Sequence, residues 1–199
     1  MRFIIAICLL FPMAPALFGQ TYAEGIEQFR AKYIADLLAE KREPVKPSQV
    51  KFINFYPTDP QYAVIATFTE TPGSKPFMVP THSGKNKPFR EYGALHFKLG
   101  TDTFTLHAYQ MVNLLNDVTE QDELFIMFND ETNYETTYAG GRYIDLSVKD
   151  IHDGKILLDF NKCYNPYCAY SEGFSCPIPP AQNQLHTPIM AGEKMFLHQ

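Results

Sequence analysis

Carboxylate, amide and guanidinium side chains are concentrated between residues 129 and 145, in the sequence NDETNYETTYAGGRYID. Arg142 supplies a planar fork of donors. Oxygen atoms come from four further residues, Asp130, Glu131, Asn133 and Glu135. These residue types suit a small polar ligand, or a calcium loop, although the spacing lacks the order of the helix-loop-helix calcium class. A turn closed by side-chain hydrogen bonds, with Arg142 paired to Asp145 or Asp159, accounts for the same residues without a ligand.

Paired carboxylates are a second kind of chemistry, because two acids at a suitable distance act as general acid and base in hydrolysis. Asp159, at the end of an expected strand, is the acid of most interest. A hydrolase-like enzyme would use it with Arg142 and Glu193, and Cys168 is a further candidate. In the alternative, Asp159 accepts hydrogen bonds from backbone amides of the following loop. The chain has no established nucleophile, metalloprotease or phosphate-loop motif, so no catalytic role is assigned and no cofactor is expected.

Short motifs follow one another along the chain in a fixed order. They are DxT at 130–132, ETxY at 135–138, GRYID at 141–145, DFNxxYNPYCAY at 159–170, SCPxPP at 175–180, Asn183 and AGEK at 191–194. This series resembles the signature of domain-of-unknown-function family number 1684, a bacterial family. The resemblance covers nearly all of the chain after its first 20 residues. It implies one domain and a site among these motifs, but no reaction, because the biochemistry of that family is not established.

The candidate site residues come from these motifs. The expected binding residues are Asp130, Glu135, Arg142, Tyr143, Asp159, Asn161, Asn165, Tyr167, Asn183 and Glu193. No metal ligand is assigned. Five tyrosines would add stacking surface with a polar tip: Tyr138, Tyr143, Tyr164, Tyr167 and Tyr170. A small polar-ligand-binding module therefore accounts for the sequence best, with the enzyme as the alternative and an inert structural domain as a third possibility.

Three of the four cysteines lie between residues 159 and 196. In the family pattern the position of Cys163 usually holds a small residue such as Ala, so Cys163 is this chain's departure. In an oxidising compartment we expect a disulfide between Cys168 and Cys176, with Cys163 to Cys168 as the competing pair. A buried pair of thiols and a functional thiol are the other two interpretations.

One helix is expected near the start of the chain. Thr21 and Glu24 form a capping box, and apolar residues recur at helical spacing up to about Glu40. Pro44 and Pro47 follow, and proline does not continue a helix. The most common reason for such an apolar stripe is packing on the protein's own sheet.

After residue 50 the pattern changes to short segments with a period of two, which is typical of antiparallel sheet. Strands are expected at residues 52–55, 62–70, 77–81, 92–99, 103–110, 124–128, 142–148, 155–160 and 194–197. Together these elements predict an α+β fold, mainly antiparallel β, with the N-terminal helix packed on a curved sheet, barrel or sandwich.

One hairpin can be predicted to its register. The apolar residues on each side of the Gly100 turn must share a face, which pairs Phe97 with Phe104 and Leu95 with Leu106. The same register sends two histidines, His96 and His107, to the opposite face. They could hold a metal, but no third ligand is specified by the spacing, and two polar residues on a solvated face are the more common case.

The first 20 residues are typical of a secretory signal peptide, with Arg2 before an apolar run and a possible cleavage site after Ala16 or Gly19. Its removal leaves residues 21–199 as a single exported domain, periplasmic or secreted, with no membrane span. The net charge of the whole chain is −5, and loss of Arg2 makes it more negative. Nucleic acid is therefore not an expected partner, and a small polar ligand is.

Overall fold

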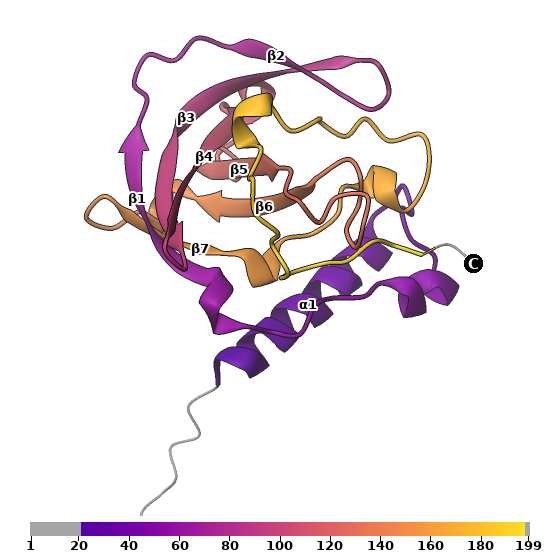
Figure 1. Ribbon diagram of the computed structural model, residues 1–199. Coiled ribbons are helices and arrows are strands. Elements are labelled where there is room, and N and C mark those ends of the chain that lie inside the picture. The colour runs from indigo at the N-terminus through magenta and orange to yellow at the C-terminus, as the bar shows by residue number, and fades with distance from the viewer. Residues whose placement is uncertain (1–20, 198–199) are drawn as a thin grey trace, which may run out of the picture.

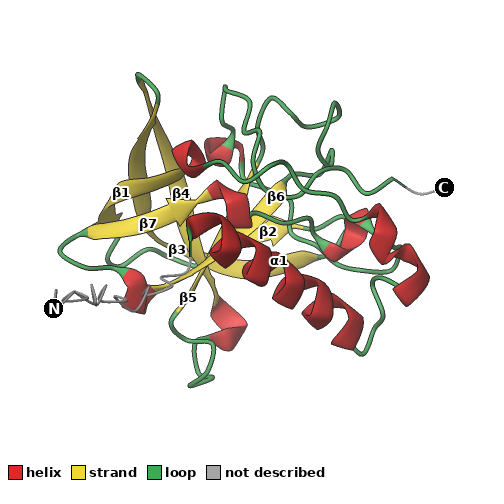
Figure 2. Cartoon of the chain, turned by 90° about the horizontal axis from the view of Figure 1, so that it is seen from below, coloured by secondary structure: helices red, strands yellow, loops and turns green. Residues whose placement is uncertain are grey.

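A computed structural model describes residues 21–197, so the expected signal peptide lies outside the described residues. One long helix, α1 (Tyr22–Ala39), accompanies a single antiparallel sheet of seven strands. The sheet is curled into an open half-barrel, and α1 lies across one end of it (Figure 1, Figure 2). The expected α+β fold, mainly antiparallel β, is therefore confirmed. Of the curved sheet, barrel and sandwich that the sequence allowed, the protein has the curved sheet, with the helix packed on it.

Helix α1 begins at the predicted capping box. The N–H of Glu24 donates to Thr21 Oγ1 at 3.3 Å, and the N–H of Thr21 donates to the Glu24 carboxylate at 2.8 Å. These two bonds satisfy donors that the first helical turn would otherwise leave free. Near its other end the helix buries Leu37 in an apolar cluster with Tyr170 and Phe196. This end of the apolar stripe packs on Tyr170 and Phe196 and not on a strand, so it attaches α1 to the C-terminal segment.

The strands are β1 (Ala63–Glu70), β2 (Phe77–Pro80), β3 (Asn86–Leu99), β4 (Asp102–Met111), β5 (Glu123–Phe128), β6 (Arg142–Ser147) and β7 (Lys155–Asp159). Their order is β6-β5-β4-β3-β1-β7, and β2 pairs with β3. The strands expected at 52–55 and 194–197 are wrong. Residues Pro47–Phe52 form a short 3₁₀ helix, and the β-pairing near these two segments is limited to one bridge, between Phe55 and Glu193. A single bridge does not make a ladder.

The predicted hairpin register is confirmed, since Phe97 pairs with Phe104 and Leu95 with Leu106. Further along, the register of β3 and β4 shifts between Glu91 and Gly93. Such a bulge bends its strand and increases the local twist. It also divides β3 into a part that pairs with β1 and a part that pairs with β2, and so contributes to the curl of the sheet.

The two hairpin histidines bind different partners. His96 Nδ1 lies 3.0 Å from the hydroxyl of Thr105, and His107 Nδ1 lies 3.1 Å from the carboxylate of Glu91. Between residues 21 and 197, no three His, Cys, Asp or Glu side chains are grouped as a metal site would require. The metal alternative for this pair therefore gains no support.

The core fills the curl of the sheet. Alternate strand residues such as Leu95, Leu106 and Ile126 contribute to one apolar cluster, and the chain after β7 adds Leu185 and Ile189 to the same cluster. In Figure 1 this C-terminal segment, drawn in orange and yellow, crosses the curled sheet. The segment that carries most of the sequence motifs is thus part of the core. No helix in the described part of the chain has the length and apolar character needed to cross a bilayer.

Candidate functional site

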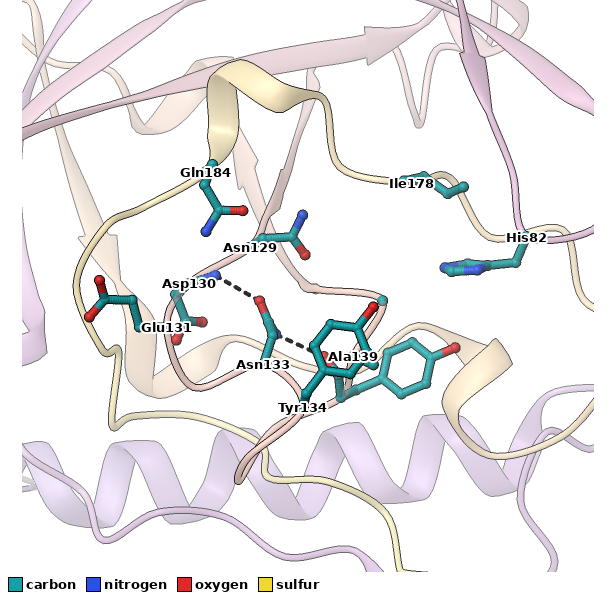
Figure 3. A pocket seen from close by; sticks show the side chains of 11 residues that line it. His82, Asn129, Asp130, Glu131, Asn133, Tyr134, Ala139, Ile178 and Gln184 are labelled. Atoms are coloured by element: carbon teal, nitrogen blue, oxygen red, sulfur yellow. Dashed lines mark hydrogen bonds between the residues drawn. The ribbon is translucent and has the colours of Figure 1, made fainter.

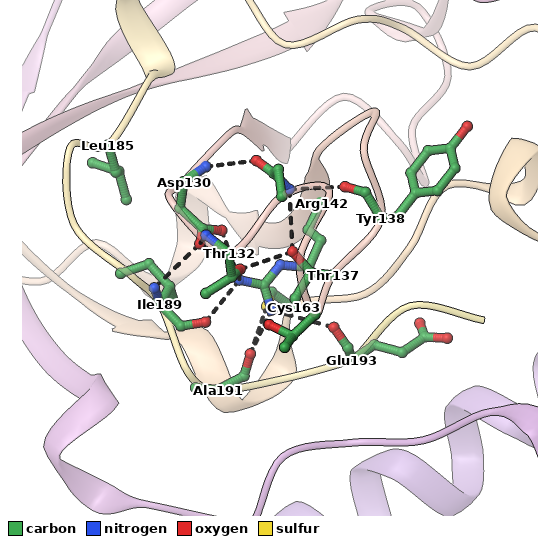
Figure 4. Close-up of polar contacts among 12 residues, drawn as sticks. Asp130, Thr132, Thr137, Tyr138, Arg142, Cys163, Leu185, Ile189, Ala191 and Glu193 are labelled. Carbon is green, nitrogen blue, oxygen red and sulfur yellow. Dashed lines mark hydrogen bonds and ion pairs between the residues drawn. The ribbon is translucent and has the colours of Figure 1, made fainter. Parts of the chain in front are cut away.

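Arg142 stands at the start of β6 and is completely buried (Figure 4). Its Nη2 donates to Asp130 Oδ2 at 2.7 Å and to the carbonyl of Ile189 at 2.9 Å. Its Nη1 donates to the carbonyls of Ala191 at 2.6 Å and Glu193 at 3.2 Å. The predicted pairing with Asp145 or Asp159 is wrong, because the partner is Asp130. The guanidinium therefore ties β6 to the C-terminal segment.

Asp130 also closes the turn that follows β5. Its Oδ1 accepts from the N–H of Thr132 at 2.8 Å and from the N–H of Ile189 at 3.2 Å. Asn133 closes the turn from the other side, since its Oδ1 accepts from the Asp130 N–H at 2.7 Å and its amide donates to the Tyr138 carbonyl at 2.8 Å. Side-chain bonds of this kind hold an irregular loop in one conformation. The turn that the sequence allowed as an alternative to a ligand loop is present.

Glu193 is buried where α1, the 164–170 segment and the C-terminal segment meet. Its carboxylate accepts from the hydroxyl of Tyr170 at 2.7 Å, from the N–H of Asn165 at 2.9 Å and from the hydroxyl of Tyr33 at 3.2 Å. Burial raises the pKa of Glu193 to about 7, although the hydrogen bonds from Asn165 and the tyrosines oppose this shift. The side chain of Asn165 donates in turn to the Lys194 carbonyl at 2.8 Å.

Asp159 has the structural role that the sequence allowed as an alternative. Its Oδ1 accepts from the N–H of Asn161 at 3.0 Å and from the hydroxyl of Tyr22 at 2.9 Å. The side chain of Asn161 holds Asp59, accepting from its N–H at 2.9 Å and donating to its carbonyl at 2.8 Å.

Arg142, Asp159 and Glu193 are the groups on which the enzyme hypothesis rests. All three are buried, and their side chains bond to different side chains within the chain: Arg142 to Asp130, Asp159 to Tyr22, and Glu193 to Tyr170. These side chains are used for hydrogen bonds inside the chain, and a catalytic role for them stays a prediction.

Asn183 is fully buried beside β4 and β5, which share a single paired position, Tyr109 with Phe125. The Asn183 amide donates to the carbonyls of His107 at 2.9 Å and Met127 at 2.8 Å, and its oxygen accepts from the His107 N–H at 2.7 Å. The side chain thus pairs with both strands in place of a neighbouring backbone and satisfies groups that would otherwise be unpaired.

The cysteines pair as predicted, with a disulfide between Cys168 and Cys176 whose Cα atoms lie 6.2 Å apart. Cys163 is free and buried. Burial raises the pKa of its thiol to about 11, which disfavours the thiolate that a nucleophile or metal ligand requires. The disulfide closes the loop from 168 to 176, and Cys163 is part of the buried core, so the cysteines have structural roles.

The described surface is hollowed where residues 129–140 face residues 178–184, with a volume of about 500 Å³ (Figure 3). The two motif-bearing segments therefore meet across a shared space. Its lining residues are His82, Asn129, Asp130, Glu131, Asn133, Tyr134, Tyr138, Ala139, Gly140, Ile178 and Gln184. Gly140 allows the close approach of its neighbours, because a Cβ there would lie 2.7 Å from His82 Nε2 and 2.5 Å from the Tyr138 ring.

Tyr134 stands at the rim of this hollow in an unfavourable backbone conformation. Its φ is +69°, in the left-handed region that bulky residues rarely adopt, and 79% of the side chain is exposed. Backbone strain of this kind clusters at functional sites, so Tyr134 is a candidate ligand contact. His82, Glu131 and Gln184 are also exposed around the same hollow.

The expected binding residues are distributed unevenly with respect to this hollow. Asp130 lines it, and Glu135 lies exposed in the same loop but outside the lining. Tyr143 and Tyr167 line a separate hollow. The other six are buried and hydrogen-bonded within the chain, so a direct ligand role for them stays a prediction. They are Arg142, Asp159, Asn161, Asn165, Asn183 and Glu193.

The residues that sequence reasoning missed at this hollow are His82, Tyr134 and Gln184. Glu131 and Asn133 were recognised as oxygen donors, but Tyr134 between Asn133 and Glu135 has no spacing that distinguishes it. His82 comes from the loop after β2, and its N–H donates to the Cys176 carbonyl at 3.0 Å, which ties this loop to the distant C-terminal segment. No local signal predicts that contact.

Comparison with known proteins agrees with these motifs. Residues 48–194 match the family model described as "Protein of unknown function (DUF1684)". A solution NMR structure of an uncharacterised protein from Haloarcula marismortui is similar, with 32% sequence identity and a TM-score of 0.65. The match covers 88% of this chain and 99% of that chain. Among curated proteins there is no match.

Proposed function

Since the chain belongs to the DUF1684 family of proteins of unknown function, we propose that it is a binding module for a small polar ligand. The ligand site is the hollow between residues 129–140 and 178–184. The observation that carries this proposal is the contrast between its floor and its rim. The floor is fixed by Asp130 and Asn133, whereas Glu131, His82 and Tyr134 have no side-chain hydrogen bond to another described residue.

The lining favours a neutral, hydroxyl-rich ligand. It offers the carboxylate of Glu131 as an acceptor and the side chains of Asn129 and Gln184 as both donors and acceptors. Tyr134 and Tyr138 provide rings on which an apolar face can stack. The lining contains no lysine or arginine to balance a phosphate. A sugar-like molecule, polar at its edge and apolar on one face, matches this set of groups.

Preorganisation of the rim supports the same proposal. The loop is anchored to the buried guanidinium of Arg142 through Asp130, an ion pair of 2.7 Å with neither side chain exposed. A loop that is already ordered loses little conformational entropy when a ligand binds, so a small contact area is sufficient for measurable affinity.

A thermal-shift screen followed by calorimetry tests the proposal. The panel holds neutral mono- and disaccharides beside nucleotides and amino acids. We expect a neutral saccharide to raise the Tm, and Tyr134→Ala and Glu131→Gln to weaken its binding about tenfold. Glu135→Gln is the matched control, because Glu135 is exposed in the same loop but does not line the hollow. Absence of any hit, or equal effects of the Glu131 and Glu135 substitutions, would contradict the proposal.

The proposed place of action is outside the cytoplasm, either periplasmic or secreted. Two features support it: the composition of residues 1–20 and the disulfide between Cys168 and Cys176, a bond that persists in oxidising compartments. Mass spectrometry of the protein from its cells should find the N-terminus near residue 21 and Cys163 as the free thiol. An intact leader in the cytoplasmic fraction would count against export.

A further inference from the structure

A second hollow, of about 320 Å³, lies against the disulfide-closed loop and is separate from the proposed polar-ligand site. Its lining combines Phe125 and Tyr143 from β5 and β6 with Tyr164, Tyr167 and Phe174 from the chain after β7. The volume is within the range of small-molecule sites, which are mostly apolar with a few convergent polar groups.

The aromatic rings form ordered walls. The centroids of Phe125 and Tyr143 lie 4.7 Å apart at an interplanar angle of 67°, and those of Tyr167 and Phe174 lie 5.2 Å apart at 71°. Two of the three tyrosine hydroxyls are engaged within the chain: Tyr143 donates to the Pro177 carbonyl at 2.5 Å, and Tyr164 to Asp145 at 2.7 Å. The surface offered to a ligand by these two residues is therefore mainly ring.

Two cations stand at this aromatic hollow. The Arg42 guanidinium lies over the Phe174 ring at 4.3 Å and donates to the Gly173 carbonyl at 2.7 Å, so its position is fixed. Lys87 is half-buried, and among the described residues it has no ion pair. Burial lowers the pKa of Lys87, and the positive charge of Arg42 lowers it further.

No carboxylate lines this hollow. A half-buried ammonium without a counter-ion is unfavourable, and an anion placed between two cations relieves the repulsion while making charge-assisted hydrogen bonds. The charge of the site therefore selects an anion, and its rings select a planar apolar body.

We propose that this hollow binds a small aromatic carboxylate, with its ring against Tyr143, Tyr167 and Phe174 and its carboxylate held by Lys87 and Arg42. This site goes beyond the polar-ligand site and does not rest on it. Both the sign of the charge and the shape of the walls contribute to the specificity.

Calorimetry with phenylacetate, its neutral analogue phenylacetamide, and acetate tests the proposal. We expect phenylacetate to bind with a Kd at least about tenfold lower than phenylacetamide, because a charge-assisted hydrogen bond contributes more than a neutral one. Acetate alone, which lacks the ring, should bind more weakly than phenylacetate. Lys87→Met should reduce the preference for the acid, because only Arg42 then remains, and Lys87→Arg should retain it because it keeps the charge.

Lys85→Met is the matched control, since Lys85 lies two residues away, is exposed and does not line the hollow. Each variant is first compared with the parent by circular dichroism and Tm without ligand. Amide chemical shifts should change at Phe174 and Ser175 when phenylacetate is added. The proposal is overturned by absence of phenylacetate binding at millimolar concentration, by equal affinity for acid and amide, by equal effects of the Lys85 and Lys87 substitutions, or by shifts confined to Glu131 and Tyr134.

Discussion

Arg142 was a candidate ligand-binding residue, but in the fold it is a buried donor of hydrogen bonds. Its two terminal nitrogens donate to Asp130 and to three carbonyls of the C-terminal segment. Its Nε is buried and has no partner among the described residues. A planar guanidinium spreads five donors over three nitrogens, whereas a lysine ammonium offers three donors on one atom. The sequence correctly indicated that Arg142 meets a carboxylate, but it did not identify Asp130.

Removing one member of this buried pair should destabilise the protein strongly. Arg142→Met leaves Asp130 charged and buried, and the expected loss is about 3 to 5 kcal/mol in chemical denaturation. The exposed pair Lys32 and Asp36, at 2.6 Å, provides the control, since Lys32→Met should cost less than about 1 kcal/mol. Similar losses for the two substitutions would contradict a structural role for Arg142.

At the scale of elements, the chain after β7 is irregular yet ordered, because its backbone groups find partners on other elements. Asn183 pairs with β4 and β5, and the disulfide between Cys168 and Cys176 closes the loop that carries Phe174. The disulfide could be proposed from the sequence because both cysteines lie in one short segment. The pairing of Asn183 could not, because His107 and Met127 are far from it along the chain.

Replacing both bridged cysteines by serine should lower the free energy of unfolding by roughly 2.5 kcal/mol, the chain-entropy value for so short a loop. The same variant should bind phenylacetate more weakly, since Phe174 and Cys176 line the aromatic hollow. Cys163→Ala is the control, because it leaves the bridge intact and introduces the residue usual in the family pattern. Denaturation and calorimetry on both variants measure these effects. Unchanged stability of the double serine variant would show that the bridge does not stabilise the fold.

At the scale of the whole molecule, the N-terminal helix, the curled sheet and the C-terminal segment are joined by a buried carboxylate. Glu193 accepts from Tyr33 of α1 and from Tyr170 and Asn165. Its neighbour Gly192, at φ +71°, has no space for a side chain, because a Cβ would lie 2.6 Å from the Cys163 carbonyl oxygen. The AGEK motif is therefore explained by packing and by buried hydrogen bonds.

This carboxylate should make the stability of the protein depend on pH. The pKa of Glu193 is raised from 4.5 to about 7 in the folded state. The unfolded chain therefore releases the proton first, and stability present below pH 4.5 is lost as pH rises toward 7. The difference in unfolding free energy between the parent and Glu193→Gln should change by on the order of 3 kcal/mol across that window.

Urea denaturation of both proteins in steps between pH 4 and about 8 measures this difference. Glu123, whose pKa burial also raises to about 7, is present in both proteins, so its contribution cancels in the comparison. Parallel curves for the two proteins would exclude the buried Glu193 as the cause.

Local patterns in the sequence were sufficient for the capping box of α1, the approximate positions of β1 to β7, and the register of Phe97 with Phe104, although β3 begins at Asn86 and not at the expected residue 92. Helix caps and the period of two depend on residues a few positions apart, so they can be read without the fold. The expected strand at 52–55 failed for the complementary reason. The segment does contain the apolar residues that suggested a strand, but a strand also needs a neighbouring strand to pair with along its length.

Tertiary structure alone decided how the polar motif residues are used. The sequence places Asp130, Arg142 and Glu193 in one series of motifs, but burial and partner identity depend on which distant segments meet. Only the fold brings His82 to Tyr134 across one hollow, and Lys87 to Arg42 across the other. A side chain becomes available to a ligand when its neighbours leave it unpaired, and those neighbours are separated along the chain by tens of residues.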